Sequence, residues 1–525
     1  MNTSELIAGL CRPEAYDHEA HTFEVLQTHI SWVILTGPFA YKLKKPVDLG
    51  FVDFSTLEKR RFYCEEELRL NRRLAEDLYL GVTAVTGSPA ALHMVDTATP
   101  SSAPIEYALK MRQFDQQHLA SAAFERGELE PRHWDALADR LAEFHRQQPA
   151  VDLGKPLGTL AVAAKYMRTN FEKLFAAELD DAIQQTVRAV SEWTEAQLVQ
   201  WSDVFAARRE AGMVRECHGD LHLCNMVFLN DALVPFDCID FNDELRWIDV
   251  QSEIAFCVMD LEDRDHRPTA YRFLNRYLEG TGDYPGLALL PLFQSYRAMV
   301  RAKVASLRLQ QADLGASERE ALINDCHSYI QLAAHYTRPS TPQLVLMHGP
   351  SGSGKSTWSQ RLIEAAGVVR LRSDIERKRL CGKWPALVQV PREPPKETYS
   401  TAATGATYAR LLDLVSETIA AGCSTVVDAT FLQRAQRQVF TDWADAHRVP
   451  WIIADCHAPP DELRRRVDRR AAQGGDASDA DRTILEQQLG TLEPLSPAEA
   501  ASAISLADDR PEDFARLVRR LGPLA

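Results

Sequence analysis

A glycine-rich segment in the second half of the chain limits its fold more than any other feature. Residues 349–356 read Gly-Pro-Ser-Gly-Ser-Gly-Lys-Ser and directly follow the apolar run 343–348. Glycines permit backbone conformations in which successive amides converge on a phosphate, and a following helix adds its N-terminal dipole. A strand before the loop and a helix after it are typical of a phosphate-binding loop of the Walker A type. The sequence therefore predicts a strand–loop–helix unit that binds a nucleoside triphosphate.

Within this loop, Lys355 is expected to reach the β and γ phosphates, and the Ser356 hydroxyl is expected to hold magnesium. The predicted nucleotide-binding set is Gly349, Ser351, Gly352, Ser353, Gly354, Lys355, Ser356 and Thr357.

Further strands are predicted after the loop, at 367–370, 424–427 and 451–454, and they alternate with helical stretches. This alternation predicts an α/β P-loop domain with a parallel, doubly wound sheet. The segment Arg-Pro-Ser-Thr-Pro at 338–342 interrupts a helical pattern and is the predicted linker. We therefore expect one domain over residues 1–337 and a second over 343–525, in keeping with a chain of 525 residues.

Asp374 is the candidate base of the second domain, because it follows a predicted strand and can face the γ phosphate. A second interpretation, compatible with the first, is that Ser373 or Asp374 caps the following helix. Arg377 is a candidate for binding a substrate anion or phosphate. Asp428 ends the run Ser-Thr-Val-Val-Asp and is predicted to be a Walker B-type acid or a strand-end substrate contact.

Arginines later in this domain are candidates for substrate or phosphate recognition. Arg434 is one, although charges on a helix face are more often only solvated. Arg466 and Arg470 belong to an arginine-rich stretch that precedes Gln-Gly-Gly-Asp-Ala-Ser at 473–478, which resembles a mobile lid.

A different pattern occurs in the first half, where residues 218–225 read His-Gly-Asp-Leu-His-Leu-Cys-Asn. Asp220 is the candidate base, and Asn225 has the spacing of a magnesium-binding asparagine. Asp240, which ends the run Phe-Asp-Cys-Ile-Asp, is the predicted magnesium carboxylate, and Asp237 is the second choice. His218 is expected to brace the loop through hydrogen bonds to backbone.

The strand-like run Phe-Ala-Tyr-Lys at 39–42 places a small residue two positions before Lys42, as in strands that hold the α and β phosphates. The alternative is that Lys42, Lys44 and Lys45 form a solvated basic edge. Glu67, on a helix predicted over 55–74, is the chosen partner of Lys42 from the run 65–67.

Strands are also expected at 31–35, 84–86, 91–95 and 105–111, and a hairpin at 226–236, whereas 115–210 and 247–335 are expected to be helical. The clustering of strands early in the chain favours an α+β layout.

The motif at 218–225 and the Ile-Asp-Phe at 239–241 resemble the aminoglycoside phosphotransferase family over residues 20–335. The resemblance implies a two-lobed, protein-kinase-like fold, with a small lobe at about 20–113 and a helical lobe at about 114–337. Two features depart from the family: no GxGxxG loop precedes Lys42, where the polar turn 28–31 is the expected substitute, and no acidic cage for a polycationic drug is evident. Aminoglycosides are therefore not carried over as the substrate.

Residues 341–525 resemble P-loop kinases of the polynucleotide-kinase-like, gluconate-kinase-like and zeta-toxin-like group, through the Walker A loop, Arg-Ser-Asp-Ile-Glu-Arg-Lys and Val-Val-Asp-Ala-Thr. The whole chain resembles bacterial fusions described as bifunctional aminoglycoside phosphotransferase and ATP-binding proteins.

A net charge of −15 disfavours broad attraction to nucleic acid, and no apolar run approaches the roughly 18 residues of a membrane span. The ten cysteines show no paired spacing, so a zinc site or disulfide framework is not expected. We therefore expect a cytoplasmic, bifunctional phosphotransferase that uses ATP and Mg²⁺ to phosphorylate hydroxyls of small molecules such as a sugar or amino sugar. The alternatives are that one half is a regulatory ATP-binding module, or that the C-terminal half is a nucleic-acid end kinase.

Overall fold

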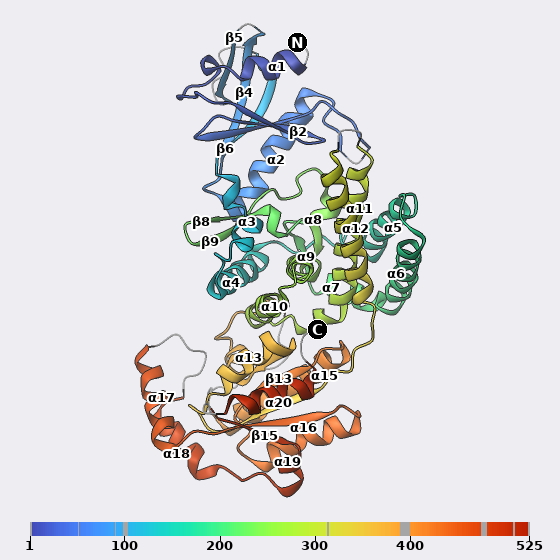
Figure 1. The fold of residues 1–525 in the computed structure, drawn as a ribbon. Coiled ribbons are helices and arrows are strands. Elements are labelled where there is room, and N and C mark those ends of the chain that lie inside the picture. Colours follow the sequence, from blue (N-terminus) through green and yellow to red (C-terminus); the bar gives the residue numbers. More distant parts are fainter. Residues whose placement is uncertain are drawn as a thin grey trace. The chain divides into compact units, whose positions relative to one another are not determined.

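The computed structural model describes residues 3–50, 52–89, 91–97, 103–311, 314–388, 400–473, 480–507 and 510–522 (Figure 1). The chain divides into two compact units. Unit 1 contains residues Met1–His133, Gln147–Gly158 and Val214–Glu253, and unit 2 contains Trp134–Arg146, Thr159–Met213 and Ile254–Ala525.

Unit 1 is built around a six-stranded antiparallel sheet with the order β1-β2-β3-β6-β4-β5. Its strands are β1 Glu24–Gln27, β2 Ser31–Leu35, β3 Phe39–Lys44, β4 Tyr79–Ser88, β5 Ala91–Asp96 and β6 Glu106–Arg112. Apolar residues that alternate along β2 and β3, such as Ile34, Tyr41 and Leu43, are buried in its core. The strands expected in this region are therefore confirmed.

Helix α2, Leu57–Ala75, contacts β4 and β6 of this sheet. The Thr56 hydroxyl accepts a hydrogen bond from the Lys59 amide (3.3 Å) and caps the helix N-terminus. The capped first turn and the buried positions Cys64 and Leu70 explain why this charged sequence forms a helix on the sheet. Shorter elements complete this part of the unit: α1 Thr3–Leu10, η1 Pro13–Ala15, η2 Gln116–His118 and α3 Ala120–Glu125.

The rest of unit 1 consists of short elements around the His-Gly-Asp motif: β7 Val214–Glu216, η3 Leu223–Asn225, β8 Met226–Leu229, β9 Ala232–Pro235, α8 Asp243–Arg246 and β10 Trp247–Asp249. Strands β8 and β9 form the predicted hairpin. Its turn residues Asn230 and Asp231 have φ of +50° and +63°, the backbone that a two-residue hairpin turn requires. Strand β10, which pairs with β7, was not predicted; residue 247 was expected to begin a helix.

The first part of unit 2 is helical, as predicted for these segments. Its elements are α4 Pro131–Gln147, α5 Leu160–Phe175, α6 Asp181–Gln200, α7 Ser202–Glu210, α9 Val250–Asp263, α10 Arg267–Thr281, η4 Tyr284–Leu289, α11 Leu290–Leu309 and α12 Ala316–His335. Met299 and Ala302 of α11 share a buried core with Cys326 and Ile330 of α12. Among the described residues, none of the helices combines the length and the apolar character that crossing a membrane demands.

The second part of unit 2 contains a five-stranded, fully parallel sheet with the order β12-β13-β11-β14-β15. The strands are β11 Leu344–His348, β12 Val369–Arg372, β13 Thr425–Asp428, β14 Trp451–Cys456 and β15 Ala503–Leu506. The helices are α13 Lys355–Ala366, α14 Ser373–Leu380, α15 Thr401–Ala420, α16 Arg434–Ala446, α17 Pro460–Gln473, α18 Arg482–Thr491, α19 Pro497–Ala501 and α20 Pro511–Leu521.

This sheet confirms the predicted α/β fold, with two differences. Strand β12 begins two residues later than expected, because Gly367 has φ of +62° and ends helix α13. Edge strand β15 was missed, since its short run Ala-Ile-Ser-Leu follows an alanine-rich helix and carries little strand propensity of its own.

Candidate active sites

The first site collects charged side chains from β3, α2 and the segment after β9. Lys42 and Lys44 are two residues apart on β3 and therefore point to the same face of the sheet. Lys42 Nζ donates to Glu67 Oε1 and to Asp237 Oδ1, both at 2.7 Å. Lys44 Nζ donates to Glu67 Oε2 at 2.8 Å and also forms an ion pair with Asp240. The structure thus pairs Lys42 with Glu67, the partner chosen from the sequence, and excludes a solvated basic edge for Lys42 and Lys44.

The charges in this cluster hold one another in the ionised state. Burial by itself would raise the pKa of Glu67, but the two lysine ammonium groups lower it to about 2. Burial would lower the pKa of Lys42, but the carboxylates of Asp237 and Glu67 raise it well above its usual value. The pKa of Asp240 is raised, chiefly by its burial and in spite of Lys44.

The two aspartates considered as metal ligands differ in their access to solvent. The side chain of Asp240 is 7% exposed and faces Lys44, whereas the side chain of Asp237 is 46% exposed beside Lys42. A carboxylate that binds a solvated metal–nucleotide complex must be reachable from solvent. The geometry therefore favours Asp237, the second choice from the sequence, over Asp240.

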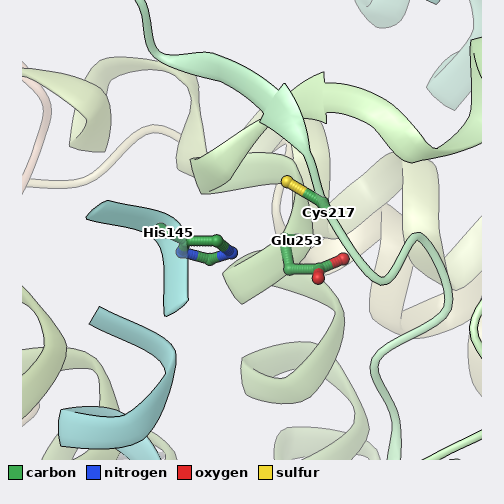
Figure 2. Close-up of side chains that lie close together, drawn as sticks. All are labelled: His145, Cys217 and Glu253. Atoms are coloured by element: carbon green, nitrogen blue, oxygen red, sulfur yellow. The ribbon is translucent and has the colours of Figure 1, made fainter. Parts of the chain in front are cut away.

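The loop that carries Asp220 is fixed by a residue that the sequence interpretation missed. The Glu253 carboxylate accepts hydrogen bonds from the backbone amides of His218 (2.6 Å) and Gly219 (2.8 Å). Figure 2 shows Glu253 near the end of the strand that leads through Cys217 into this loop. The one signal for this role is a carboxylate within the apolar stretch of α9, because a buried charge there requires partners.

Within the loop, the side-chain nitrogen Nδ2 of Asn225 donates to the backbone oxygen (3.0 Å) and to Oδ2 (2.7 Å) of Asp220. The structure therefore brings the candidate base and the candidate metal-binding amide together. His218 Nε2 is 2.8 Å from the Phe236 backbone oxygen, which confirms its expected bracing role. His222 Nε2 is 3.4 Å from Asp220 Oδ2.

A short polar turn stands where other kinases carry a glycine-rich loop. The Thr28 hydroxyl accepts a hydrogen bond from the Ser31 amide (3.0 Å), so the link between β1 and β2 is stabilised by its own side chains. The sequence indicated this turn as the substitute, and the structure places it next to β2 in the sheet that carries Lys42.

The second site is formed by the loop between β11 and α13. Gly349, Gly352 and Gly354 have φ of +130°, +82° and +91°, which is backbone that only glycine adopts without strain. A Cβ at Gly349 would lie 2.5 Å from the Cys456 backbone oxygen, so this position requires glycine for close approach as well. Lys355 Nζ donates to the Pro350 backbone oxygen (2.8 Å), and burial lowers the pKa of Lys355.

A cavity of about 1150 Å³ opens over this loop. The predicted site residues on its lining are Ser351, Gly352, Gly354, Lys355, Ser356, Thr357, Asp374, Arg377, Asp428, Arg466 and Arg470. Gly349 and Ser353 lie in the loop itself, and the Ser353 side chain is buried. Arg434 does not belong to the described lining; its backbone amide instead binds the Glu493 carboxylate (2.5 Å).

The cavity also has amide side chains that the sequence interpretation missed, because nothing in their spacing marks them. They are Gln433, Gln436, Gln487 and Gln488. The side-chain oxygen of Gln488 accepts a hydrogen bond from the Ser351 amide (2.7 Å), so α18 contacts the phosphate-binding loop directly.

The acidic residues of the second site lie at the ends of neighbouring parallel strands, where the carboxyl ends of strands meet. Asp428 ends β13, and its Oδ2 accepts a hydrogen bond from the Ser359 hydroxyl (3.2 Å). Asp374 lies in the first turn of α14, with Arg377 at 3.3 Å. The alternative that Ser373 or Asp374 caps this helix is wrong, because the helix begins at Ser373 and Arg372 occupies the cap position.

The arginine-rich stretch forms α17, which packs against the phosphate-binding loop. A Cβ at Gly352 would lie 2.9 Å from the Leu463 backbone oxygen. Arg466 donates to the Gly352 backbone oxygen (3.3 Å), and Arg470 donates to the Ala480 backbone oxygen (2.7 Å). Residues 474–478 of the proposed lid lie outside the described residues, so the lid remains a prediction.

Comparison with known proteins assigns a class to each part of the chain. Residues 62–290 match the Phosphotransferase enzyme family, and residues 344–495 match the family described as AAA domain. The phosphotransferase-family match and the parallel-sheet P-loop domain make this chain an ATP-dependent kinase that uses a divalent metal.

The family of the full-length chain is shown by two mycobacterial relatives. The chain is 31% identical over 468 residues to the uncharacterized protein Rv2004c of Mycobacterium tuberculosis H37Rv, with 87% of this chain and 88% of the relative covered. The uncharacterized protein Mb2027c of Mycobacterium bovis matches with the same identity and coverage. The chain belongs to the family of these proteins; in this chain, the part that matches the phosphotransferase family precedes the part that matches the AAA domain.

Solved structures resemble each part of the chain separately. The choline kinase of Cryptosporidium parvum Iowa II aligns with a TM-score of 0.40 and 9% identity over 63% of this chain and 95% of its own. The amicoumacin kinase hAmiN, solved in complex with AMP-PNP, Ca²⁺ and Ami, aligns with a TM-score of 0.39 and 13% identity over 63% of this chain and 94% of its own. A gluconokinase of Sinorhizobium meliloti 1021 aligns with a TM-score of 0.24 and 21% identity over 35% and 97%.

Proposed function

We propose that both halves of this protein transfer the γ-phosphoryl group of Mg-ATP to a hydroxyl group of a small molecule. The observation that carries the proposal for the first half is the contact of Lys42 with both Glu67 and Asp237. A lysine on a strand, a glutamate on the next helix and an aspartate beside the catalytic loop form the arrangement that positions a triphosphate in kinases.

In the first site, Asp220 orients the acceptor hydroxyl and takes its proton as the oxygen attacks the γ phosphorus. The bond between the γ phosphorus and the β–γ bridging oxygen breaks, and ADP leaves. Lys42 holds the α and β phosphates. The oxygens of Asn225 and Asp237 are the hard ligands that Mg²⁺ prefers, and the ion would neutralise charge on the triphosphate.

In the second site, the amides between Gly349 and Thr357 surround the phosphates, with Lys355 at the β and γ groups. Two residues are suited to hold Mg²⁺. The hydroxyl of Ser356 would bind the ion directly, and the carboxylate of Asp428 would bind water molecules coordinated to the ion. Asp374 orients the acceptor hydroxyl, and Arg377, Arg466 and Arg470 neutralise the transferred phosphoryl group.

The acceptor of the second site is a small polyhydroxylated molecule, such as a sugar or amino sugar. The cavity has amide side chains from two segments, 433–436 and 487–488, and amides exchange hydrogen bonds with hydroxyl groups. We assign the first activity to residues 1–337, with lobes at about 20–113 and 114–337, and the second to 343–525.

The test is a screen of hydroxyl-containing metabolites with ATP labelled in the γ position, run on wild type, Asp220→Ala and Lys355→Ala. Each single variant is expected to lose one set of labelled products and to keep the other. If one variant removes all labelled products and the other removes none, the half whose variant removes none is a regulatory ATP-binding module. No labelled product with any acceptor would contradict the proposal.

One observation favours a nucleic-acid end kinase as a second candidate for the C-terminal half. Arg466, Arg469 and Arg470 all line the cavity above the phosphate-binding loop and could grip a nucleic-acid backbone. Turnover of oligonucleotide ends that falls steeply between low and moderate salt would favour this candidate, because phosphate contacts release counterions. Salt-insensitive turnover of a small alcohol would exclude it.

A further inference from the structure

Helix α10 belongs by sequence to the phosphotransferase part of the chain, yet within unit 2 it packs against the P-loop domain. It lies beside α13, the helix that follows the phosphate-binding loop, and it also contacts β12 (Figure 1). The side-chain amide of Asn275 bonds to the backbone at the start of β12, donating to the Val368 oxygen just before the strand (3.0 Å) and accepting from the Arg370 amide within it (2.7 Å). Helix α10, which belongs to the phosphotransferase part of the chain, therefore covers one side of the P-loop domain.

Glu279, near the C-terminal end of α10, is a deeply buried charged residue at this contact. Its side chain is 1% exposed, and Oε1 accepts hydrogen bonds from Arg370 at 2.8 Å and 2.7 Å. Oε2 is buried, has no hydrogen-bond partner among the residues that the structure describes, and lies 3.7 Å from a guanidinium nitrogen of Arg372. Glu279 thus contributes the negative charge between two arginines of one strand.

Both arginines lead to Asp428 in the second site. Arg372 Nε is 3.9 Å from Asp428 Oδ2, which is longer than a hydrogen bond. Arg370 donates to the Ser359 hydroxyl (3.4 Å), and that hydroxyl donates to the same Asp428 oxygen (3.2 Å). Glu279 is therefore linked to Asp428 along two routes, one through Arg372 alone and one through Arg370 and Ser359.

The backbone of Glu279 supports the helix that carries Asp374. Its carbonyl oxygen accepts hydrogen bonds from Arg379 of α14 (2.6 Å) and from the Trp384 indole nitrogen (2.9 Å). Since α14 begins one residue before Asp374 and ends with Leu380, the same residue of α10 fixes the strand before this helix and the helix itself.

We propose that Glu279 is a positioning residue of the second kinase site, supplied by the phosphotransferase part of the chain. This inference rests on the proposed role of Asp428 toward Mg²⁺. By attracting Arg372, Glu279 prevents that guanidinium from closing a tight ion pair with Asp428, and the carboxylate stays available for the metal's water shell. Without the charge of Glu279, Arg372 is expected to move onto Asp428 and compete with Mg²⁺.

The test uses the full chain in an Asp220→Ala background, so that ATP hydrolysis reports on the second site. Glu279→Gln is compared with Arg276→Gln, which removes an exposed ion pair to Asp139 from the same helix. Two readouts are compared: the Mg²⁺ concentration for half-maximal hydrolysis, and the Mg²⁺ affinity measured by calorimetry with a non-hydrolysable ATP analogue bound. Both are expected to weaken about tenfold in Glu279→Gln, a typical cost of losing an outer-shell partner, and to stay unchanged in Arg276→Gln. A wild-type Mg²⁺ dependence in Glu279→Gln would overturn the proposal.

Arg372→Gln keeps the experiment decisive if Glu279→Gln does not fold, because it leaves the buried pair of Arg370 and Glu279 intact. It removes the competing cation, so the Mg²⁺ concentration for half-maximal hydrolysis is expected to fall below that of the background protein. An unchanged or higher value would overturn the proposal. The background itself is checked with Lys355→Ala: if hydrolysis persists there, the second site does not turn over ATP, and the proposed function of that site fails together with this inference.

Discussion

At the scale of single residues, the first site depends on how lysines and carboxylates are paired. Lys42 and Lys44 share the two oxygens of Glu67, and each then takes a different aspartate. The Lys44–Asp240 pair is buried and closed, whereas Asp237 faces solvent. The same cluster therefore contains a buried pair with a structural role, Lys44–Asp240, and a partly exposed pair that a nucleotide can reach, Lys42–Asp237.

Asp237→Asn is expected to lower kcat of the first site by at least about 100-fold, because the amide lacks the charge of the carboxylate that we propose as a metal ligand. This loss corresponds to about 3 kcal/mol of transition-state stabilisation. Asp240→Asn is expected to affect the temperature of unfolding more than the Mg²⁺ requirement. The measurement is the rate of labelled product formation as a function of Mg²⁺. The assignment would be reversed if Asp240→Asn needed much more Mg²⁺ for product formation and Asp237→Asn needed as much as wild type.

Glu67 gives the protein a pH-dependent stability whose sign follows from its lowered pKa. Because the folded pKa is about 2 and the ordinary value is 4.5, the contribution is complete above about pH 4.5 and is lost as the pH falls toward 2. Glu67→Gln should therefore lower the free energy of unfolding near neutral pH by about 3 kcal/mol, and the difference from wild type should shrink below pH 4.5.

Urea denaturation at a series of pH values measures this difference. Glu65→Gln is the matched control, since Glu65 lies on the same helix in an exposed i,i+4 pair with Arg61. A Glu67→Gln effect that does not change with pH would contradict the assignment of charge to this cluster.

At the scale of elements, the candidate site residues lie at the ends of helices and strands. Asp428 and the loop of Lys355 follow neighbouring strands of the parallel sheet, and Asp374 follows the edge strand β12. In unit 1, Glu253 of α9 bonds the backbone of the catalytic loop. Helix α10 ends at Gly282, whose φ of +74° allows its amide to bond back to the Leu278 oxygen (2.7 Å).

Gly282→Ala is expected to destabilise the protein by about 1–2 kcal/mol, because alanine is disfavoured at this positive φ. Its Cβ would also lie 3.0 Å from Arg379 Nε. Gly405→Ala is the control: Gly405 is within α15 with open space around its Cβ position, so alanine should stabilise it by about 0.5–1 kcal/mol. Thermal unfolding of both variants measures the effects, and equal stability of the two would refute the requirement for glycine at the end of α10.

At the scale of the whole molecule, the P-loop domain shares buried charges with helices that precede the predicted linker. Arg370 and Arg379 are 7% and 3% exposed, and both bond to Glu279 of α10. Because α10 covers these arginines, the last helices of the phosphotransferase part and the P-loop domain belong to one compact unit, which contains residues 254–525.

A fragment of residues 339–525 is therefore expected to be less stable than the same domain in the full chain, by about 3–5 kcal/mol, because removing Glu279 leaves Arg370 without its carboxylate. Denaturant unfolding followed by tryptophan fluorescence of the fragment and the full chain measures the difference. In the fragment, Arg370→Met should recover part of the loss, whereas a fragment as stable as the domain in the full chain would show that α10 is dispensable.

The sequence alone determined the strand–loop–helix of residues 344–366, the hairpin 226–235 and the presence of two phosphate-handling motifs. These are local patterns: apolar alternation, glycines in a short loop and carboxylates at fixed spacing specify their conformation within a few residues. Lys42 and Glu67 were also found, because a strand followed directly by a helix limits which side chains can meet.

Only the tertiary structure showed that Asp240 is buried and Asp237 exposed, revealed Glu253, and placed Glu279 beside the second site. Each of these depends on a contact between segments far apart in the chain, and on which carboxylate is left facing solvent once the others are buried. Residue spacing contains no information on that choice, since the free energy of a buried charge is set by the partners that folding brings to it.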